Sequence, residues 1–320
     1  MWPSRLENKM QSFDLVIPLF NEAECIDETI TRIRRLFEKL SDNFKCRMIF
    51  VDDGSIDNTV EKIFQHKTDK SDILLVKLSR NFGHQIALTA GLNIANADFI
   101  GIIDGDLQDP PELFESMLKI SIEQEYDVVY GKRETREGET IFKKFSAHIF
   151  YLLLSKLCEV DIPRNTGDFR LITRTVLEKF NQMPERHRFV RGMVPYIGLR
   201  SYAYLYSRSA RFAGETKYPL RKMIRFSLDA IFSFSTKPIK FIRVFSVFTL
   251  LLSIILGVRI LFLKIFTDEV IIGYTSTIII FLFFTSVQML SISILGEYIG
   301  RIFEESKGRP LYFVDYVSDI

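Results

Sequence analysis

The sequence is poor in cysteine and lacks the common phosphate-binding loops. Its 320 residues include only 3 cysteines, Cys25, Cys46 and Cys158, which lie far apart. They form neither a zinc pattern nor a disulfide framework, which favours a reducing compartment. No G-x-G-x-x-G follows a predicted strand and no G-x-x-x-x-G-K-[ST] occurs, which excludes the dinucleotide fingerprint and the P-loop. Any phosphate bound here must therefore be neutralised by basic side chains or by a metal ion.

An excess of charge of one sign is also missing. The 42 lysine and arginine residues nearly balance the 40 acidic residues, so the net charge of +2 does not suggest a nucleic-acid partner. Residues 1–11 are polar, and we expect no cleaved secretory signal. No Ser/His/Asp or Cys/His spacing points to covalent catalysis. We expect the scattered histidines to be structural or exposed; they are His66, His84, His148 and His187.

Short apolar runs alternate with amphipathic segments through the first 131 residues. The predicted strands cover 13–18, 47–51, 73–78, 99–103 and 127–131. The predicted helices cover 21–40, a segment after 57–59, 84–95 and 112–120. This alternation indicates right-handed βαβ units and an α/β fold with a Rossmann-like, mostly parallel sheet. In such sheets ligands bind at the carboxyl ends of the strands.

Polar side chains follow three of these strands. Asn21 and Glu22 come after the first, and Asp52 and Asp53 end the second. The fourth runs into Asp104-Gly105-Asp106-Leu107-Gln108-Asp109-Pro110-Pro111. Because the carboxyl ends of parallel strands share one edge of the sheet, we expect the three clusters to converge there.

The segment 104–111 offers three carboxylates and a carboxamide, the hard oxygen ligands that suit Mg²⁺ or Mn²⁺. A solvated acidic turn is one alternative. A calcium loop is another, in which positions 1, 3, 5 and 12 are Asp104, Asp106, Gln108 and Glu115. Its position 6, where the sharp turn needs glycine, is however Asp109. Convergence at the sheet edge favours the metal site.

Basic and amphipathic segments follow residue 131. The run 132–139 is either a solvated charge cluster or a basic lid over phosphates. Apolar residues keep helical spacing over 142–153, and 208–217 is strongly basic. Over 220–232 an apolar stripe is flanked by basic residues, which is typical of an amphipathic helix at a membrane interface. Packing into a protein core is the alternative for both apolar stripes.

Two long apolar segments come last. Residues 244–263 are apolar except for Arg259, and 270–296 contain no charged residue. At about 1.5 Å per residue, each is long enough to cross about 30 Å of hydrocarbon. Lysine and arginine flank the pair on its outer sides, so the positive-inside rule places both termini in the cytoplasm. A buried soluble hairpin is the alternative.

Four motifs occur in an order that resembles the GT-A-fold glycosyltransferases of family 2. They are Val16-Ile17-Pro18-Leu19-Phe20-Asn21-Glu22, Val51-Asp52-Asp53-Gly54-Ser55, Asp104 to Pro111, and Gly214-Glu215-Thr216-Lys217-Tyr218. With two C-terminal apolar segments, the chain is similar over nearly its whole length to polyprenyl-phosphate glycosyltransferases of this family. These include dolichol-phosphate mannose synthases and the bacterial undecaprenyl-phosphate type, which has two membrane spans.

The resemblance implies a reaction and its partners. A sugar passes from a nucleotide-diphospho-sugar, with UDP favoured over GDP, to a polyprenyl phosphate in one inverting displacement. Mg²⁺ or Mn²⁺ is the implied cofactor, and the lipid bilayer and a homo-oligomer, such as a tetramer, are the implied partners. The expected location is the bacterial inner membrane, with the catalytic domain in the cytoplasm. The sequence does not name the sugar.

The resemblance also implies roles for individual residues. The nucleotide pocket would be lined by Pro18, Asn21, Glu22, Asp52, Asp53 and Asp104. The metal would be held by Asp104, Asp106 and Gln108, and phosphates by Arg133, Arg211 and Lys217. Asp106 and Gln108 are the expected direct ligands, with Asp104 acting through the ribose or a water and Asp109 capping the next helix.

Asp168 matches an acidic residue that is important for activity in this family. A phosphomonoester has a second pKa of about 6, so the acceptor is already anionic at neutral pH. We therefore expect Asp168, which we group with Asp106 as catalytic, to position other groups and not to act as an obligatory base.

The expected organisation has four parts. Residues 1–217 form the GT-A domain, with an interface helix near 141–158, and 218–240 form a second interface helix. Residues 241–300 hold the two spans and 301–320 a cytoplasmic tail. Two other functions stay open: a glycosyltransferase that acts on hydroxyl groups, and a non-catalytic scaffold. The first usually carries a Q-x-x-R-W motif, whereas the single tryptophan here is Trp2.

Overall fold

The computed structural model describes residues 10–68, 72–134, 163, 166–207, 232, 235–266 and 273–320. Several predicted features lie outside these residues. They are Arg211, Lys217, residues 135–139 of the charged run 132–139, the apolar stripe at 142–153 and most of the helix expected at 218–240.

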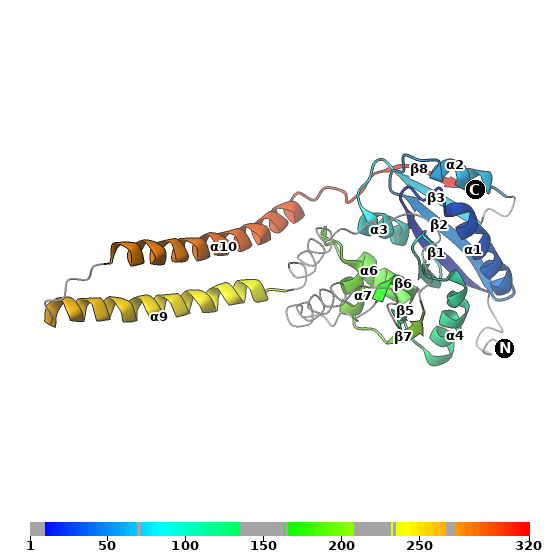
Figure 1. The fold of residues 1–320 in the computed structure, drawn as a ribbon. Helices are drawn as coiled ribbons and strands as arrows, with labels where there is room; N and C mark the ends of the chain where they lie inside the picture. The colour runs from blue at the N-terminus through cyan, green and yellow to red at the C-terminus, as the bar shows by residue number, and fades with distance from the viewer. Residues whose placement is uncertain are drawn as a thin grey trace.

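A sheet of eight strands forms the centre of the described fold (Figure 1). In chain order the strands are β1 (Gln11–Leu19), β2 (Phe44–Asp52), β3 (Ile73–Leu78), β4 (Phe99–Ile102), β5 (Val128–Arg133), β6 (Thr166–Thr173), β7 (Ser201–Tyr206) and β8 (Val314–Asp319). Their order across the sheet is β7-β5-β6-β4-β1-β2-β3-β8. Strands β3, β2, β1 and β4 are mutually parallel, whereas β6 runs antiparallel to β4 and β5, and β8 antiparallel to β3. The predicted Rossmann-like, mostly parallel sheet is confirmed.

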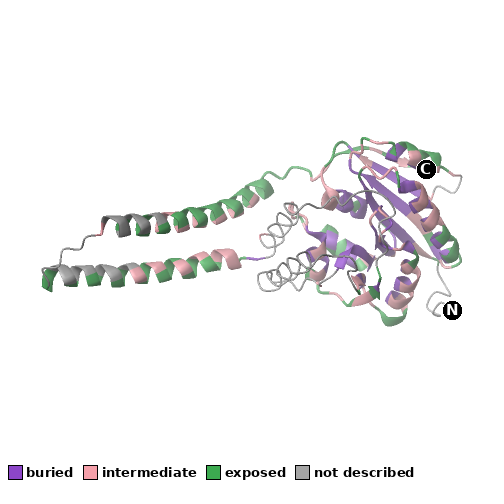
Figure 2. Cartoon of the chain, viewed as in Figure 1, coloured by how far each residue is buried: buried purple, intermediate pink, exposed green. Residues whose placement is uncertain are grey.

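Helices cover both faces of this sheet. One face packs against α1 (Ile26–Leu40), α2 (Thr59–Gln65), the short 3₁₀ helix η2 (Pro111–Leu113) and α4 (Phe114–Gln124). The other packs against α3 (His84–Ile94), α6 (Arg174–Asn181) and α7 (Val190–Tyr196). On β1, Leu15 and Ile17 belong to the first core and Val16 to the second, as the alternation of a strand requires. Figure 2 shows the buried strands between the two helical layers.

Phe114 lies at the centre of the first core. Its ring is fully buried, with ring centroids 5.7 Å from Phe13 and 5.0 Å from Phe169. We expect Phe114→Ala to lower the free energy of unfolding by about 3–5 kcal/mol, because it removes apolar contacts and leaves a cavity. Urea unfolding measures this. Ile56→Ala, at a side chain that is 90% exposed, is the matched control and should change stability by less than about 0.5 kcal/mol.

Three segments differ from the expectation. The first helix begins at Ile26 and not at residue 21, because Asn21 takes a positive φ of 54° and forms a turn. The segment Thr166–Thr173 is a buried strand in the middle of the sheet, although its polar sequence with a glycine does not read as one. The stretch expected as a C-terminal tail adds β8 to the edge of the sheet.

Two long helices extend away from the sheet side by side (Figure 1). They are α9 (Lys237–Phe266) and α10 (Tyr274–Ser306). Near the sheet, the Tyr298 hydroxyl donates to the Ser235 carbonyl at 2.7 Å. Over the described residues, no helix combines the length and apolar character that a membrane crossing requires. The transmembrane hairpin therefore stays a prediction.

The end of α10 returns to the α/β domain at the loop before α7. His187 Nε2 lies 2.9 Å from Glu304 Oε2, and the backbone N–H of Arg186 donates to Glu305 Oε1 at 2.7 Å. Beyond the helix, Tyr312 accepts a hydrogen bond from Asn93 of α3. The base of the hairpin is thereby attached beside α7.

Candidate active site

The carboxyl end of β4 and the start of β6 bring two aspartates together. These antiparallel strands pair Ile102 with Arg170, and two further steps in the same register place Asp104 opposite Asp168. Both therefore lie at the edge where ligands bind in sheets of this kind. The sequence separates them by 64 positions, so their proximity follows from the strand pairing alone.

The acidic segment after β4 has alternating burial. Gly105, Leu107 and Asp109 are buried, whereas Asp104, Asp106 and Gln108 are partly exposed. The turn is tight: a Cβ on Gly105 would lie 2.4 Å from the Leu19 side chain, and Leu107 has a positive φ of 57°. The Gln108 backbone N–H donates to Asp106 Oδ1 at 3.2 Å. The three predicted metal ligands are thus the more exposed residues of this stretch.

Asp168 is fully buried and strongly bound. Arg191 donates two hydrogen bonds to it, from Nε to Oδ1 at 3.0 Å and from Nη2 to Oδ2 at 2.9 Å. His84 Nε2 lies 3.2 Å from Oδ2, and Gln85 Nε2 donates to the same oxygen at 3.3 Å. Although burial opposes ionisation, Arg191 and His84 hold the pKa of Asp168 well below its usual range. The side chain is therefore a permanent carboxylate at neutral pH.

His84 is a site residue that the sequence does not single out. It begins α3, and its Nε2 lies between Asp168 Oδ2, at 3.2 Å, and Asp104 Oδ1, at 3.6 Å. Asp53 fixes the turn before it by accepting hydrogen bonds from the backbone N–H groups of Phe82 and Gly83 at 2.7 and 2.9 Å. Burial lowers the pKa of His84, but Asp168 and Asp104 outweigh it and raise the pKa to about 9.

The raised pKa of His84 gives the metal-free protein a pH-dependent stability. The folded-state pKa of about 9 exceeds the unfolded value of about 6.5, so the stabilisation is complete below pH about 6.5 and is lost as the pH rises toward about 9. We expect the urea midpoint, measured with EDTA present, to fall over this window. His84→Asn should flatten that slope. An equal slope in His84→Asn would show that another group titrates.

The residues at this edge fit a divalent cation. Among the described residues, His84, Asp104 and Asp168 each place a potential ligand atom within 4.8 Å of the other two. Asp104 Oδ1 is buried without a hydrogen-bond partner. Both oxygens of Asp168 already accept hydrogen bonds from Arg191, whereas Asp104 Oδ1 accepts none. The negative potential that favours the His84 imidazolium would also attract a metal ion.

The residues predicted for the nucleotide pocket gather beside this cluster. The Asn21 backbone N–H donates to Ser55 Oγ and its side-chain oxygen accepts from Ile56, while the Glu22 N–H donates to Thr59 Oγ1. These bonds join the loops after β1 and β2. Pro18 near the end of β1, Asp52 at the end of β2 and Asp53 directly after it are all buried. Burial raises the pKa of both aspartates.

Arg133 lies on the other side of the acidic segment. Its Nη2 is 3.6 Å from Asp109 Oδ2, and its Nε donates to the Tyr206 hydroxyl at 3.3 Å. Tyr206 in turn donates to Asp109 Oδ1. The expectation that Asp109 caps the next helix is wrong, because the N-cap of η2 is Pro110 and Asp109 faces β5 and β7. Arg133 is the one predicted phosphate-binding residue within the described part of the chain.

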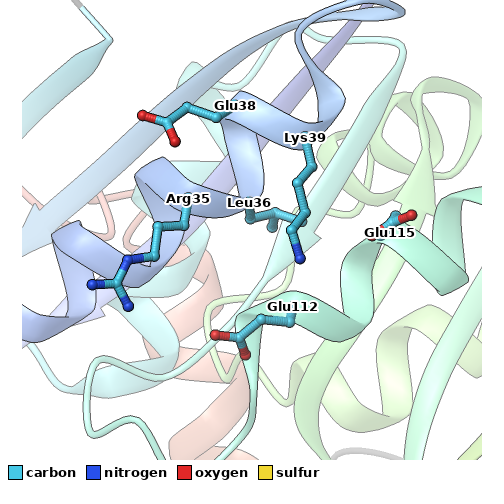
Figure 3. Close-up of a pocket in the computed structure, with 6 residues that line it drawn as sticks. All are labelled: Arg35, Leu36, Glu38, Lys39, Glu112 and Glu115. Carbon is cyan, nitrogen blue, oxygen red and sulfur yellow. The ribbon is translucent and has the colours of Figure 1, made fainter.

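A separate hollow of about 550 Å³ lies between α1 and α4 (Figure 3). It is lined by Arg35, Leu36, Glu38, Lys39, Glu112 and Glu115. None of these belongs to the carboxyl-edge cluster. The mixed charges across it are those of two neighbouring solvated helices.

A Rossmann-like mixed sheet with an acidic cluster at its carboxyl edge fits a GT-A type of domain. A family model described as glycosyl transferase family 2 matches residues 14–180. The uncharacterized glycosyltransferase YkcC of Bacillus subtilis is 42% identical over 302 residues, which cover 94% of this chain and 93% of that protein. The prophage bactoprenol glucosyl transferase homolog of Escherichia coli is 37% identical, covering 95% of this chain and 98% of its own. The bactoprenol glucosyl transferase of Shigella phage SfV is 36% identical, covering 94% and 97%.

This chain belongs to glycosyl transferase family 2. The resemblance drawn from its four motifs is confirmed by the family model and by relatives that align with nearly the whole chain.

Proposed function

We propose that this protein transfers a sugar from a nucleotide-diphospho-sugar to a polyprenyl phosphate, producing a lipid-linked monosaccharide. The observation that supports this most is the acidic segment at the carboxyl edge of a family 2 fold, which contains Asp104, Asp106 and Gln108. The named bactoprenol glucosyl transferases, which align with 96–98% of their own length, favour a polyprenyl-phosphate acceptor. A uridine nucleotide is the preferred donor in this proposal.

The proposed reaction is one displacement at C1 of the sugar. An oxygen of the acceptor phosphate forms the new bond to C1 as the bond from C1 to the donor diphosphate breaks, and the nucleoside diphosphate leaves. Mg²⁺ or Mn²⁺, held by Asp104, Asp106 and Gln108, would neutralise the diphosphate and the charge that grows on it. In this proposal Asn21, Glu22 and Asp53 line the nucleotide pocket, and Arg133 meets a phosphate.

Asp168 has the properties of a positioning residue in this scheme. Its carboxylate is fully buried and bound to Arg191 through both oxygens. A group with such a low pKa is a weak base, and an acceptor phosphate that is already anionic has little need of one. Asp168 would therefore orient His84 and the metal site.

The helical hairpin supports an association with membranes. Large apolar side chains on both helices are exposed, including Phe241, Val247, Phe248, Leu251, Ile254 and Val258 on α9, and Phe281, Met289, Leu290, Ile299 and Phe303 on α10. Such a surface is too large and too apolar to face water alone. A lipid surface would also bring the active site to an acceptor whose polyprenyl tail remains in the bilayer.

The test of the reaction uses the purified full chain with Mn²⁺, undecaprenyl phosphate and a panel of UDP- and GDP-sugars. We expect one donor to give a lipid-linked sugar, and EDTA to stop its formation. Undecaprenol without the phosphate serves as the matched acceptor. Transfer to undecaprenol, or to a sugar acceptor only, would favour the hydroxyl-directed alternative, and no turnover with any donor would overturn the proposal.

The association with membranes has its own test. We expect the full chain to float with phospholipid vesicles on a density gradient and to resist extraction at alkaline pH. A variant with Leu250, Leu251, Ile254 and Ile255 replaced by serine should float less, while serine at the exposed Ile56 should not change flotation. Full-length protein that stays at the bottom of the gradient would contradict the proposal.

A further inference from the structure

The Asp168 carboxylate is held by a residue that lies far from every predicted motif. Arg191 is on the first turn of α7, and its guanidinium meets the carboxylate through two parallel hydrogen bonds. Such a fork fixes the plane of the carboxylate as well as its position. The Arg191 side chain is 27% exposed, whereas the Asp168 side chain is fully buried.

The surrounding residues hold this pair rigidly. Gln85 donates to Asp168 through Nε2 and accepts the backbone N–H of Val190 through Oε1 at 2.9 Å, which joins α3 to the start of α7. On the same strand, the buried Arg170 donates hydrogen bonds to the backbone carbonyl oxygens of Gly167 and Asp168 at 3.0 and 3.3 Å. Both the backbone and the side chain of Asp168 are therefore fixed.

A purely structural role explains this arrangement poorly. Removing the Asp168 carboxylate from water is expensive, and a buried ion pair seldom stabilises more than apolar residues of the same size. This pair also lies at the carboxyl edge, where Asp168 contacts His84, and His84 lies 3.6 Å from Asp104. The side chains form a chain of contacts from Arg191 through Asp168 and His84 to Asp104.

We propose that Arg191 is a positioning residue of the transfer reaction, which holds Asp168 so that Asp168 orients His84 against Asp104. The inference rests on the proposed function. With both oxygens of Asp168 bound to Arg191, Asp104 is the carboxylate of this cluster that keeps an oxygen with no hydrogen-bond partner. Arg191 acts through Asp168 and does not touch the substrates.

The test compares Arg191→Gln, Arg191→Lys, Asp168→Asn and the double variant Arg191→Gln/Asp168→Asn. Substitutions in the outer shell of a metal site typically cost about 10–100-fold. We expect Arg191→Gln to lower kcat about tenfold with little change in KM for either substrate. Arg191→Lys should recover part of the loss, because it restores the charge without the fork. In the Asp168→Asn background, Arg191→Gln should cost little more, since residues that act as one unit are not additive.

The controls keep the outcomes distinct. Arg174→Gln removes another arginine that faces an aspartate, Asp98 at 3.5 Å, and should leave turnover unchanged. Thermal unfolding of each variant identifies loss of fold, and Arg191→Lys keeps the comparison possible if Arg191→Gln is unstable. A higher KM for the polyprenyl phosphate with unchanged kcat, or losses that multiply in the double variant, would overturn the inference by showing that Arg191 acts on its own. Absent turnover in the wild type would instead count against the proposed function.

Discussion

Replacing Asp106 with alanine is expected to reduce sugar transfer by about a thousandfold or more. Asp106, like Asp104 and Gln108, is partly exposed in the segment after β4. A metal ion at such a site contributes several kcal/mol of stabilisation to the charge that develops on a leaving group, and each 1.4 kcal/mol corresponds to about a tenfold change in rate. Losing one of the two proposed carboxylate ligands should therefore remove most of the activity.

Metal binding gives this prediction a second measurement. Mn²⁺ affinity, followed by electron paramagnetic resonance with no substrate present, should fall strongly in Asp106→Ala. Glu115→Gln is the matched control, because Glu115 is a nearby acid that pairs with Lys119 on α4. Its substitution should leave both affinity and turnover unchanged. If Glu115→Gln weakens binding as much as Asp106→Ala does, the calcium-loop alternative is correct.

The part of the fold that is readable from sequence is the part built from local patterns. The strands up to β5 are continuous apolar runs with buried positions such as Ile49, Phe50 and Val51, and the stripe on α1 repeats at helical spacing. The polar residues at their carboxyl ends follow directly, because a parallel sheet brings those ends to one edge. The position of Asp104, Asp106 and Asp53 at this edge is therefore predictable with no knowledge of tertiary contacts.

The remaining site residues depend on contacts between distant segments. His84 is 84 positions from Asp168, and Arg191 is on a seven-residue helix with no recognisable chemistry of its own. Strand β6 is missed because its polar residues are buried through specific partners, such as the bonds from Arg170 to backbone carbonyls. Pattern-based reading assigns such residues to the surface, since burial of charge is normally too costly.

The contacts at the base of the hairpin connect two parts of the proposed function. Arg186 and His187 contact the end of α10 and belong to the loop that leads directly into α7. That helix carries Arg191. A hairpin that associates with the membrane would thus be joined to the same element that holds Asp168. The partly exposed contact between His187 and Glu304 is worth little by itself, and the backbone bond from Arg186 and the pairing of β8 with β3 add to this attachment.

Asp168→Asn is expected to reduce turnover by about 10–100-fold, which is clearly less than Asp106→Ala. The amide keeps the shape of the side chain and one acceptor for Arg191, but it loses the charge that orients His84. If Asp168 were an obligatory base, its loss would cost as much as the loss of a direct metal ligand. The two variants are compared by kcat under saturating donor and acceptor, with Mn²⁺ affinity measured in parallel.

We expect Asp168→Asn to keep most of the Mn²⁺ affinity that Asp106→Ala loses. Equal losses of kcat in the two variants would show that the carboxylate of Asp168 takes part in the chemical step, because the Arg191 contact alone cannot account for an effect of that size.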